Sequence, residues 1–455
     1  MNSIQLNLET FAKNILELDI IGLGLSKYMD RAELLTQDFL LRHVQLNIES
    51  LDEGLKESPE SREAWRILKK EPRELVTKAG ILRYRRRYFA HIHSNEKCFL
   101  VDKLVGVDKY ERIDKSVKAD ICNLVSRHSY QESSYLACAD LISKQSVKRI
   151  IKEVNIPEPP CLPQGEPLNV LHIQVDEDHV AMEDGRCKQH RIAVIHSPSQ
   201  RRGKRVYLPQ KRYVFGRNGE AVEDFWDRVW EEICKNYNLS KNCVFYIHGD
   251  GAAWIRSGAK LLPNARYVLD KYHVMESINR IAPAGSEENS ALKYFVINNQ
   301  RSDFKRLSEL CLGRFERKEE SQEQARQYCL RNWTGISIWH EDPASGSSCA
   351  EGLVSHYLSA RFSSRPMAWM DAGLEGVSNL REHALNQGKI RYVDFKRKDE
   401  LSQQSRMESV KLEPLRKVSG VSYDYSPMPT EIFRTAKEGS LRRLQEAIKY
   451  GGLRF

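Results

Sequence analysis

Residues 241–255, KNCVFYIHGDGAAWI, contain the feature from which the fold prediction starts. The apolar run 244–247 predicts a buried strand, which stops abruptly at HGDG, residues 248–251. Asp250, placed between two glycines, has two interpretations. It caps a helix that follows a tight turn, or it binds a metal ion at the carboxyl end of a central strand, where open α/β sheets gather their ligands. This stretch alone leaves both interpretations open.

The segments around this stretch predict one mixed sheet. Strands are expected at 169–182, 190–197, 204–216, 243–250 and 265–274, with an amphipathic helix at 221–237. Three meander strands, a helix and two further strands form the order of an RNase H-like sheet. The predicted fold class is therefore mixed α+β or α/β, with an RNase H-like core that a helical insertion interrupts.

Three carboxylates are placed so that this sheet can bring them together. Asp176 follows the apolar run of the first strand, Asp250 ends the fourth, and Glu351 opens a helix after the helical stretch. The first and fourth strands are neighbours in an RNase H-like sheet, and a helix beside the sheet can add the third acid. Each acid also has an ordinary interpretation, as a solvated turn residue or a first-turn helix acid. Asp178 is a rival to Asp176 for the first position.

Carboxylates that converge repel one another unless cations hold them together. Mg²⁺ prefers oxygen ligands, and two such ions about 4 Å apart stabilise the attacking and leaving oxygens of a phosphoryl displacement. We therefore expect Asp176, Asp250 and Glu351 to bind two Mg²⁺ or Mn²⁺ ions.

Composition limits the remaining possibilities. The 455 residues are enough for two or three domains, and a net charge of +9 indicates a polyanionic partner. The ten cysteines include no CxxC pair, and His91, His93 and Cys98 lack a fourth ligand nearby, so no zinc site is expected. We find no signal peptide and no membrane-length apolar run, which predicts a cytoplasmic protein.

A basic stretch precedes the predicted core. In ILRYRRRYFAHIH, which alternates like a strand, Arg83, Arg85 and Arg87 share one face, and Tyr84 and Tyr88 interleave with them. Arginine binds phosphate oxygens and aromatic rings stack on bases, so the pattern fits a DNA surface. A charged edge strand that resists aggregation is the equal alternative.

Residues 129–154 read as two short helices that resemble a helix-turn-helix. Ser143 is the predicted N-cap of the second helix. One apolar face is formed by Val147, Ile150, Ile151 and Val154, and the candidate DNA-binding residues Lys144, Gln145, Lys148 and Arg149 lie largely elsewhere. Many helical hairpins have the same pattern and touch no DNA.

The proline-rich segment 155–167 predicts a domain boundary. The expected organisation is a helical N-terminal segment, 1–60, that packs or dimerises; a basic DNA-binding region, 61–160, with the helix-turn-helix at 129–154; the first part of the core, 166–275; a helical insertion, 276–345; the last part of the core, 346–395, with Glu351; and a charged tail, 396–455.

With these motifs in place, the sequence resembles insertion-sequence transposases of the ISLre type, in the Mutator-like branch of DDE transposases. The resemblance rests on VDEDHV with Asp176, HGDGAAWI with Asp250, LDKYHV with its Asp-x-x-His element, YCLRNWTGI, and the stretch from Glu351 through SRPMAW. It covers about residues 60 to 390.

The resemblance implies an enzyme that binds the ends of a mobile element. It cuts a phosphodiester to expose a 3′-hydroxyl, which then attacks target DNA in the same site. It also implies that His273 contacts the scissile phosphate or orients an acid, with Asp270 behind it, and that Arg361 and Arg365 contact phosphates. A structural His at a strand end and salt bridges to nearby helices are the alternatives.

The expected partners are element-end and target DNA, and no membrane. Pairing two ends favours a homo-oligomer on DNA, which would associate with the nucleoid. The rival functions are an RNase H-like nuclease that does not join strands, and a domesticated or inactive DNA-binding protein.

Overall fold

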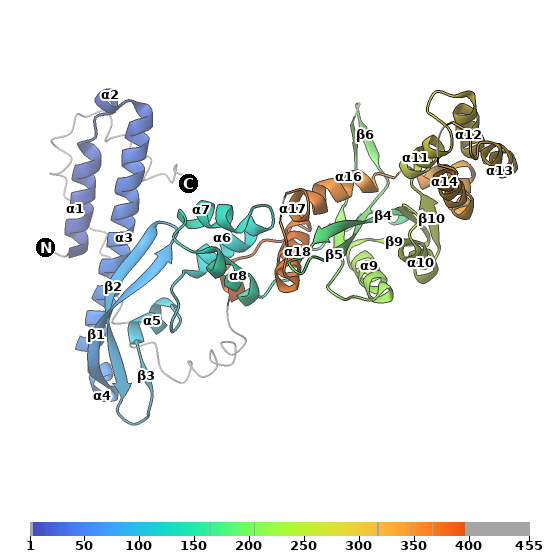
Figure 1. The fold of residues 1–455 in the computed structure, drawn as a ribbon. Coiled ribbons are helices and arrows are strands. Elements are labelled where there is room, and N and C mark those ends of the chain that lie inside the picture. Colours follow the sequence, from blue (N-terminus) through green and yellow to red (C-terminus); the bar gives the residue numbers. More distant parts are fainter. Residues whose placement is uncertain are drawn as a thin grey trace. The chain divides into compact units, whose positions relative to one another are not determined.

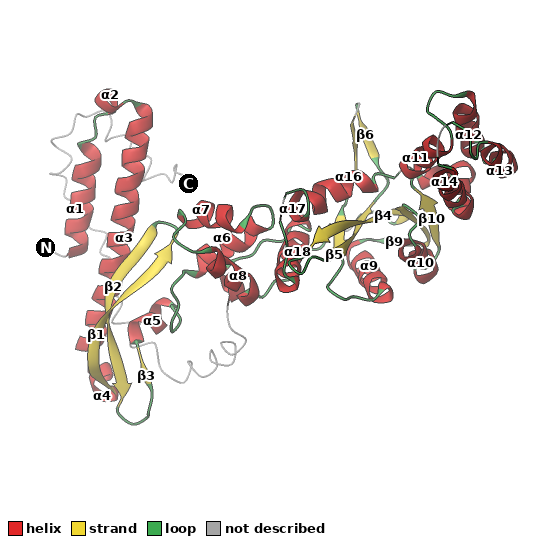
Figure 2. Ribbon diagram, viewed as in Figure 1, coloured by secondary structure: helices red, strands yellow, loops and turns green. Residues whose placement is uncertain are grey.

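The structure is a computed structural model that describes residues 3–395, apart from 164, 204, 316–317, 347 and 366. The side chains of Arg202, Arg205 and Glu351 are also outside the description, and so is the predicted charged tail at 396–455. The described chain forms two compact units: 3–74 with 82–111, and 75–81 with 112–395. Figure 1 labels their elements, and Figure 2 colours them by type.

The first unit begins with helices, as predicted for 1–60. They are α1 (Ser3–Leu16), α2 (Ile20–Leu23), α3 (Leu25–Glu57) and α4 (Pro59–Ala64), followed by the sheet β1 (Trp65–Thr77), β2 (Gly80–His91) and β3 (Lys97–Cys98), and by α5 (Leu100–Val105). A buried carboxylate, Asp102, organises the sheet: it accepts the Tyr84 hydroxyl at 2.8 Å and Arg73 Nη1 at 3.1 Å, and also pairs with Arg86. Much of the basic stretch therefore stabilises the fold.

The second unit is built on a five-stranded sheet with the order β10-β9-β4-β5-β8. Its strands are β4 (Leu168–Ala181), β5 (Cys187–His196), β8 (Arg212–Phe215), β9 (Leu239–Gly249) and β10 (Ala265–Leu269). β5 runs antiparallel to β4 and β8, whereas β9 is parallel to both β4 and β10. The strands expected at 169–182, 190–197 and 243–250 are thus confirmed. The strand expected at 265–274 is confirmed only for Ala265–Leu269, because Asp270 caps a helix that begins at Lys271.

The prediction of one long strand at 204–216 is wrong. Only Arg212–Phe215 joins the sheet, and β6 (Gln200–Arg202) and β7 (Arg205–Tyr207) form a separate two-stranded ribbon. Pro209 explains the interruption, because a proline has no N–H to donate to a strand ladder.

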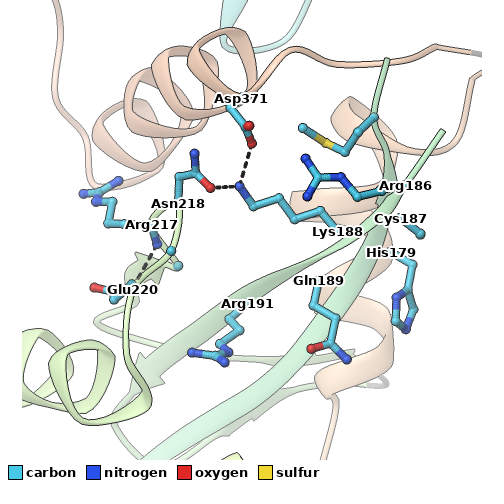
Figure 3. A pocket seen from close by; sticks show the side chains of 13 residues that line it. His179, Arg186, Cys187, Lys188, Gln189, Arg191, Arg217, Asn218, Glu220 and Asp371 are labelled. Atoms are coloured by element: carbon cyan, nitrogen blue, oxygen red, sulfur yellow. Dashed lines mark hydrogen bonds and ion pairs between the residues drawn. The ribbon is translucent and has the colours of Figure 1, made fainter. Parts of the chain in front are cut away.

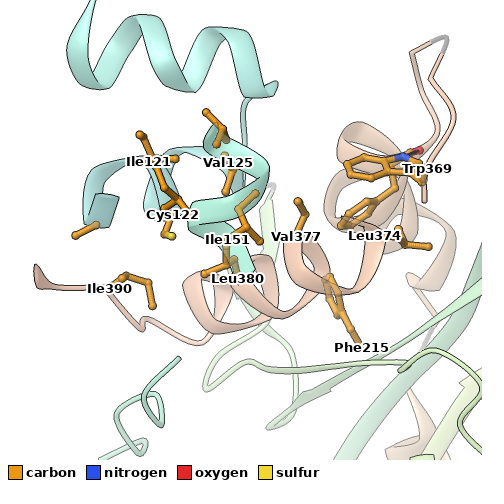
Figure 4. Close-up of a cluster of buried hydrophobic side chains, with 14 of the residues drawn as sticks. Ile121, Cys122, Val125, Ile151, Phe215, Trp369, Leu374, Val377, Leu380 and Ile390 are labelled. Carbon is orange, nitrogen blue, oxygen red and sulfur yellow. Dashed lines mark hydrogen bonds between the residues drawn. The ribbon is translucent and has the colours of Figure 1, made fainter. Parts of the chain in front are cut away.

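The two faces of the sheet are covered by different helices. One face packs on α9 (Val222–Asn236) and α10 (Ala253–Leu261), with Trp226 fully buried. The other packs on α18 (Asp371–Leu385) and on α6 (Lys115–Val125), α7 (Tyr130–Cys138) and α8 (Lys144–Glu153), as Figure 4 shows for part of this cluster. The apolar residues of β5 alternate between the two clusters, as the period of a strand requires.

The unit boundaries differ from the predicted boundary at 155–167. The helices at 115–153 lie in the same unit as the sheet, because their apolar faces pack on α18. The contact is reinforced by two buried arginines, whose guanidinium groups donate to the carbonyls of Val125 (from Arg361, 3.0 Å) and Ser126 (from Arg381, 2.6 Å).

After β10 the chain is helical, as predicted for 276–345. The elements are α11 (Lys271–Ile281), α12 (Glu287–Ile297), α13 (Arg301–Leu310), α14 (Glu319–Arg331), α15 (Trp333–Glu341) and η1 (Pro343–Ser345). They share a core around Phe304 and Trp333. The chain then enters α16 (Ala350–Val354), the π-helix η2 (Ser355–Ser359), α17 (Ala360–Phe362) and, after α18, η3 (Tyr392–Phe395).

The buried histidines make the stability of this unit sensitive to acid. Burial lowers the pKa of His190 to about 4, and Nε2 of this residue lies 2.9 Å from the Ser378 hydroxyl. The unfolded chain binds a proton at this imidazole more readily than the folded chain does. The free energy of unfolding is therefore highest above the unfolded-state pKa of about 6.5. It falls by about 3 kcal/mol for this imidazole as the pH is lowered to about 4. Urea unfolding at pH 7, 5.5 and 4 measures the loss. In His190→Gln the decline should be shallower; parallel curves for the two proteins would contradict the prediction.

Candidate functional site

Asp176 and Asp250 lie at equivalent positions on neighbouring parallel strands. β4 and β9 pair in a register that sets Gln174 opposite His248, and each acid follows two residues later. Beyond this point β9 has ended, whereas β4 continues against β5, with Asp176 opposite Ile192. The sheet therefore brings the first two predicted acids together.

The glycines beside Asp250 are required by the backbone. A Cβ on Gly249 would lie 3.0 Å from the Val175 carbonyl oxygen, and Gly251 has φ +95°, a region that L-residues rarely adopt. Asp250 Oδ1 accepts the Ala252 N–H at 3.0 Å, which supports the turn before α10. Asp250 therefore supports the turn but does not cap α10, whose N-cap is Ala252 and has no side-chain cap hydrogen bond.

The electrostatics identify a third group at this position. Burial raises the pKa of Asp176 to about 6, and the negative charge of Asp250 acts in the same direction. A hydrogen bond from the Glu177 N–H and the nearby His273 oppose this rise. Asp250 and His273 therefore both lie within electrostatic range of Asp176. A cation between the two carboxylates would relieve the penalty that burial and repulsion impose, so the donor set suits a hard divalent metal.

The segment before Glu351 is hydrogen-bonded to β4 and to the residue that follows β10. The Cys349 N–H donates to Gln174 Oε1 at 3.1 Å, and the Ser348 hydroxyl donates to Asp270 Oδ2 at 3.0 Å. α16, which carries Glu351, packs against β4 (Figure 1). The backbone of the third predicted acid is thus held beside the strand that carries Asp176.

A row of buried histidines supports these hydrogen bonds. His196 Nδ1 lies 2.7 Å from the Ser197 carbonyl, so it carries the proton, and Nε2 accepts the Gln174 amide at 3.3 Å. The same amide then presents Oε1 to Cys349. His172 stacks on His196 and bonds to His248 at 3.0 Å. Burial lowers the pKa of His172 and of His196 to about 4, which keeps both neutral.

This network predicts a change in the reactivity of Cys349. Burial raises the pKa of its half-buried thiol to about 11. Gln174→Leu removes the acceptor of the Cys349 N–H, and we expect alkylation of Cys349 by iodoacetamide to accelerate by roughly tenfold, the change that about 1.4 kcal/mol of lost protection gives. Peptide mass spectrometry over a time course measures it. Gln189→Leu, on the adjacent strand, is the matched control, and equal rates in the two variants would contradict the prediction.

The structure distinguishes the two candidates for the first acid. Asp178 Oδ2 accepts the Ser363 hydroxyl at 2.7 Å, whereas Asp176 interacts electrostatically with Asp250 and His273. The geometry favours Asp176.

Asp270 and His273, the Asp-x-x-His pair, have different surroundings. Asp270 is buried and caps α11, accepting the Tyr272 N–H at 2.9 Å, in addition to the Ser348 hydroxyl. His273 is half-buried, and its Nδ1 lies 4.0 Å from Glu276. Asp270 therefore holds backbone in place, whereas the charge of His273 acts on Asp176.

The prediction that Arg361 contacts phosphate is wrong. Its side chain is buried, donates to the Val125 carbonyl and lies 5.0 Å from the Trp369 ring. Arg365 is exposed and stays a candidate.

Arg87 is also committed to the fold. It pairs with Asp52 at 2.7 Å and Glu53 at 2.5 Å, because α3 lies against the sheet there. Arg83 is exposed and pairs with Glu74, and Arg85 is exposed. Tyr84 is buried, so it cannot stack on a base.

α8 presents its polar residues outward. Val147, Ile150 and Ile151 are buried, whereas Lys144, Gln145 and Arg149 are exposed. Lys148 is half-buried and donates to the sulfur of Met370 at 2.8 Å.

Sequence reasoning missed Gln174 and the histidines His172, His196 and His248. The available signal was the placement of imidazoles within otherwise apolar strands, where a polar group must be hydrogen-bonded.

Among the side chains that the structure describes, which exclude Glu351, no three His, Cys, Asp or Glu residues are arranged to hold a metal ion. In the described residues, no helix combines the length and apolarity that crossing a membrane requires.

The fold and site define a mixed α/β protein in which one acid lies within β4 and a second lies beside it, directly after β9. Residues 22–399 match the family described as "Uncharacterised protein family (UPF0236)", and the chain belongs to this family. A UPF0236 protein of Caldanaerobacter subterraneus subsp. tengcongensis is 31% identical over 387 residues, which cover 84% of this chain and 82% of the relative. A second from the same organism is 30% identical over 406 residues, 87% and 86% of the two chains.

The names of these relatives join eleven locus designations in the first case and four in the second. A simian T-cell lymphotropic virus intasome in complex with PP2A regulatory subunit B56 gamma is similar over 44% of this chain and 67% of the solved one. At 9% identity and a TM-score of 0.15, that likeness carries no argument.

Proposed function

We propose that the chain is the DDE transposase of an insertion sequence, which cuts and joins DNA with Asp176, Asp250 and Glu351. The observation that carries the proposal is the site itself. Two acids end up side by side on parallel strands, and the segment before the third is hydrogen-bonded to the strand of the first.

Two further observations support the proposal. The strand order β10-β9-β4-β5-β8, with its mix of parallel and antiparallel pairs, is what an RNase H-like core requires. Relatives encoded at several loci of one genome fit an element that multiplies in its host.

In this mechanism the chain's residues bind and align DNA. Asp176 and Asp250, with Glu351, would hold the metal ions, and His273 would contact a phosphate oxygen. Two Mg²⁺ or Mn²⁺ ions, when bound, supply the positive charge that stabilises the attacking and leaving oxygens. The partners are element-end and target DNA, and joining two ends in one complex calls for a homo-oligomer on DNA, associated with the nucleoid.

The test is a reaction with labelled DNA from the flanks of the native gene and a target plasmid, in Mg²⁺, in Mn²⁺ and in EDTA. Cleavage at the element end and metal-dependent joining to the plasmid are expected. Cleavage without joining would instead favour a nuclease, and stable binding without any cleavage would favour a DNA-binding protein.

Within this function we assign α7 and α8 as the helix-turn-helix. Lys144→Ala with Arg149→Ala should weaken DNA binding and lower the slope of log affinity against log salt by about one for each phosphate that is no longer neutralised. Fluorescence anisotropy at several salt concentrations measures both effects. Lys241→Ala, at an exposed position near the start of β9, is the control, and an equal effect of the control would contradict the assignment.

A further inference from the structure

A pocket with a volume of about 700 Å³ lies on the half of β5 that β8 does not cover (Figure 3). Its wall comes from the end of β4, the start of β5, the loop after β8 and the first residue of α18. The lining residues are His179, Met182, Arg186, Cys187, Lys188, Gln189, Arg191, Gly216, Arg217, Asn218, Gly219, Glu220 and Asp371. A volume of this size suits a ligand of nucleotide dimensions.

The charges of the wall favour an anion. Its four cationic side chains outnumber its two carboxylates. Lys188 pairs with Asp371 at 2.9 Å, and Arg217 with Glu382 at 3.0 Å. Arg191 makes no ion pair with the described residues and lies 5.1 Å from the Trp254 ring. Its guanidinium therefore keeps donors for a phosphate.

The wall is held in place before any ligand arrives. The Arg217 N–H donates to Glu220 Oε2 at 2.9 Å, and Arg228 Nε donates to Glu220 Oε1 at 2.6 Å. Lys188 also bonds to Asn218, so the loop is joined to β5. Gly216 allows the close approach, because a Cβ there would lie 3.3 Å from the Arg191 nitrogen. A preorganised wall lowers the entropy cost of binding.

The pocket and Asp176 lie on opposite faces of the same part of β4. His179 follows Asp176 by three residues, about 10 Å along a strand, and side chains alternate between the two faces along a strand. Glu177, on the His179 face, is close enough to both Asp250 and Arg191 for their charges to act on its carboxyl group, so the pocket adjoins Asp250. A DNA strand with one phosphate at Asp250 can reach the pocket across the edge of β4 that β9 leaves free. The amide of Gln189 offers donors and acceptors that suit a base edge.

We infer that this pocket binds one nucleotide of the DNA strand adjacent to the phosphate that is cut. The inference rests on the proposed function and adds a specific subsite to it. Arg191 faces the phosphate, and Gln189, on the same face of β5, faces the base, while Lys188 and Asn218 hold the opposite wall.

The experiment uses Cys187, which is exposed and lines the pocket. The full-length protein is mixed with element-end DNA that carries a disulfide tether on single nucleotides at successive positions from the cut. We expect a cross-link to Cys187 from one or two positions next to the cut, none from ten nucleotides away, and none in Cys187→Ser. Cross-links to the exposed Cys161 and Cys234 should not depend on tether position.

Two more arms complete the test. Arg191→Met should weaken element-end binding by about tenfold, more than Arg186→Met, whose side chain already pairs with Asp184. Protection of Cys187 from iodoacetamide is compared for element-end DNA and for deoxynucleoside monophosphate. Protection by the monophosphate alone would overturn the DNA-strand assignment. If the protein cuts and joins DNA but forms no cross-link to Cys187, the pocket does not bind a nucleotide, and the proposed function still holds.

Discussion

Asp250→Asn is expected to abolish both DNA cleavage and strand joining while the protein stays folded. The substitution keeps the side-chain oxygen that accepts the Ala252 N–H and removes the negative charge that a metal ligand needs. Replacing a residue that only hydrogen-bonds to a metal ligand already lowers metal affinity or activity by about 10- to 100-fold. Replacing a ligand itself should therefore lower activity by more than about 100-fold. Gel assays of cleavage and joining, with circular dichroism as the check on folding, measure it.

The same experiment ranks the other acids. Asp176→Asn should match Asp250→Asn, and Asp178→Asn should retain most activity, because Asp178 bonds to Ser363. Wild-type activity in Asp250→Asn, or a larger defect in Asp178→Asn than in Asp176→Asn, would refute the assignment of the metal site.

Arg212→Leu is expected to be the most damaging substitution for stability. Arg212 is only 1% exposed, and its guanidinium donates to Asn236 Oδ1 at 2.8 Å and the Asn386 carbonyl at 3.0 Å; it also bonds to the Pro160 carbonyl. It pairs with Glu232 at 3.2 Å. Leucine leaves these buried acceptors without donors, which costs about 3–5 kcal/mol.

Urea unfolding followed by tryptophan fluorescence measures this cost. Arg149→Leu is the matched control, because the Arg149 side chain is 68% exposed and its pairing with Glu153 is 3.9 Å long. Such surface pairs contribute about 0–1 kcal/mol. Equal losses in the two variants would show that the buried contacts of Arg212 do not support the fold.

The strands of the second unit were predictable because their apolar runs are long and end sharply. β9 stops at Gly249, where HGDG marks its end in the sequence. The 204–216 segment misled because its apolar pattern continues across Pro209, and the effect of the missing N–H depends on which strands pair. Local pattern identifies a strand, but the pairing of its hydrogen bonds is a tertiary property.

The candidate site was predictable to the extent that acids follow apolar runs. Asp176 and Asp250 were found in this way. Arg87 was assigned to phosphate because charge is visible in a sequence, and Arg361 because of the family resemblance, but the sequence shows neither their burial nor their partners. Arg361 binds the Val125 carbonyl, 236 residues away, and no local signal announces such a contact. Gln174 was missed for the same reason, since its importance lies in bonding at once to His196 and Cys349.

The parts of the site differ in how firmly their backbones are fixed. Asp176 lies within β4 and is paired there with β5, whereas Glu351 is the second residue of a helix of five residues that passes directly into a wider π turn. Wider turns of this kind are inherently less favourable than the α-helix and gather at places of function. The strand that carries Asp176 is therefore the more firmly fixed part of the candidate site, and adaptation to ligands of different shape is expected in the helix that carries Glu351.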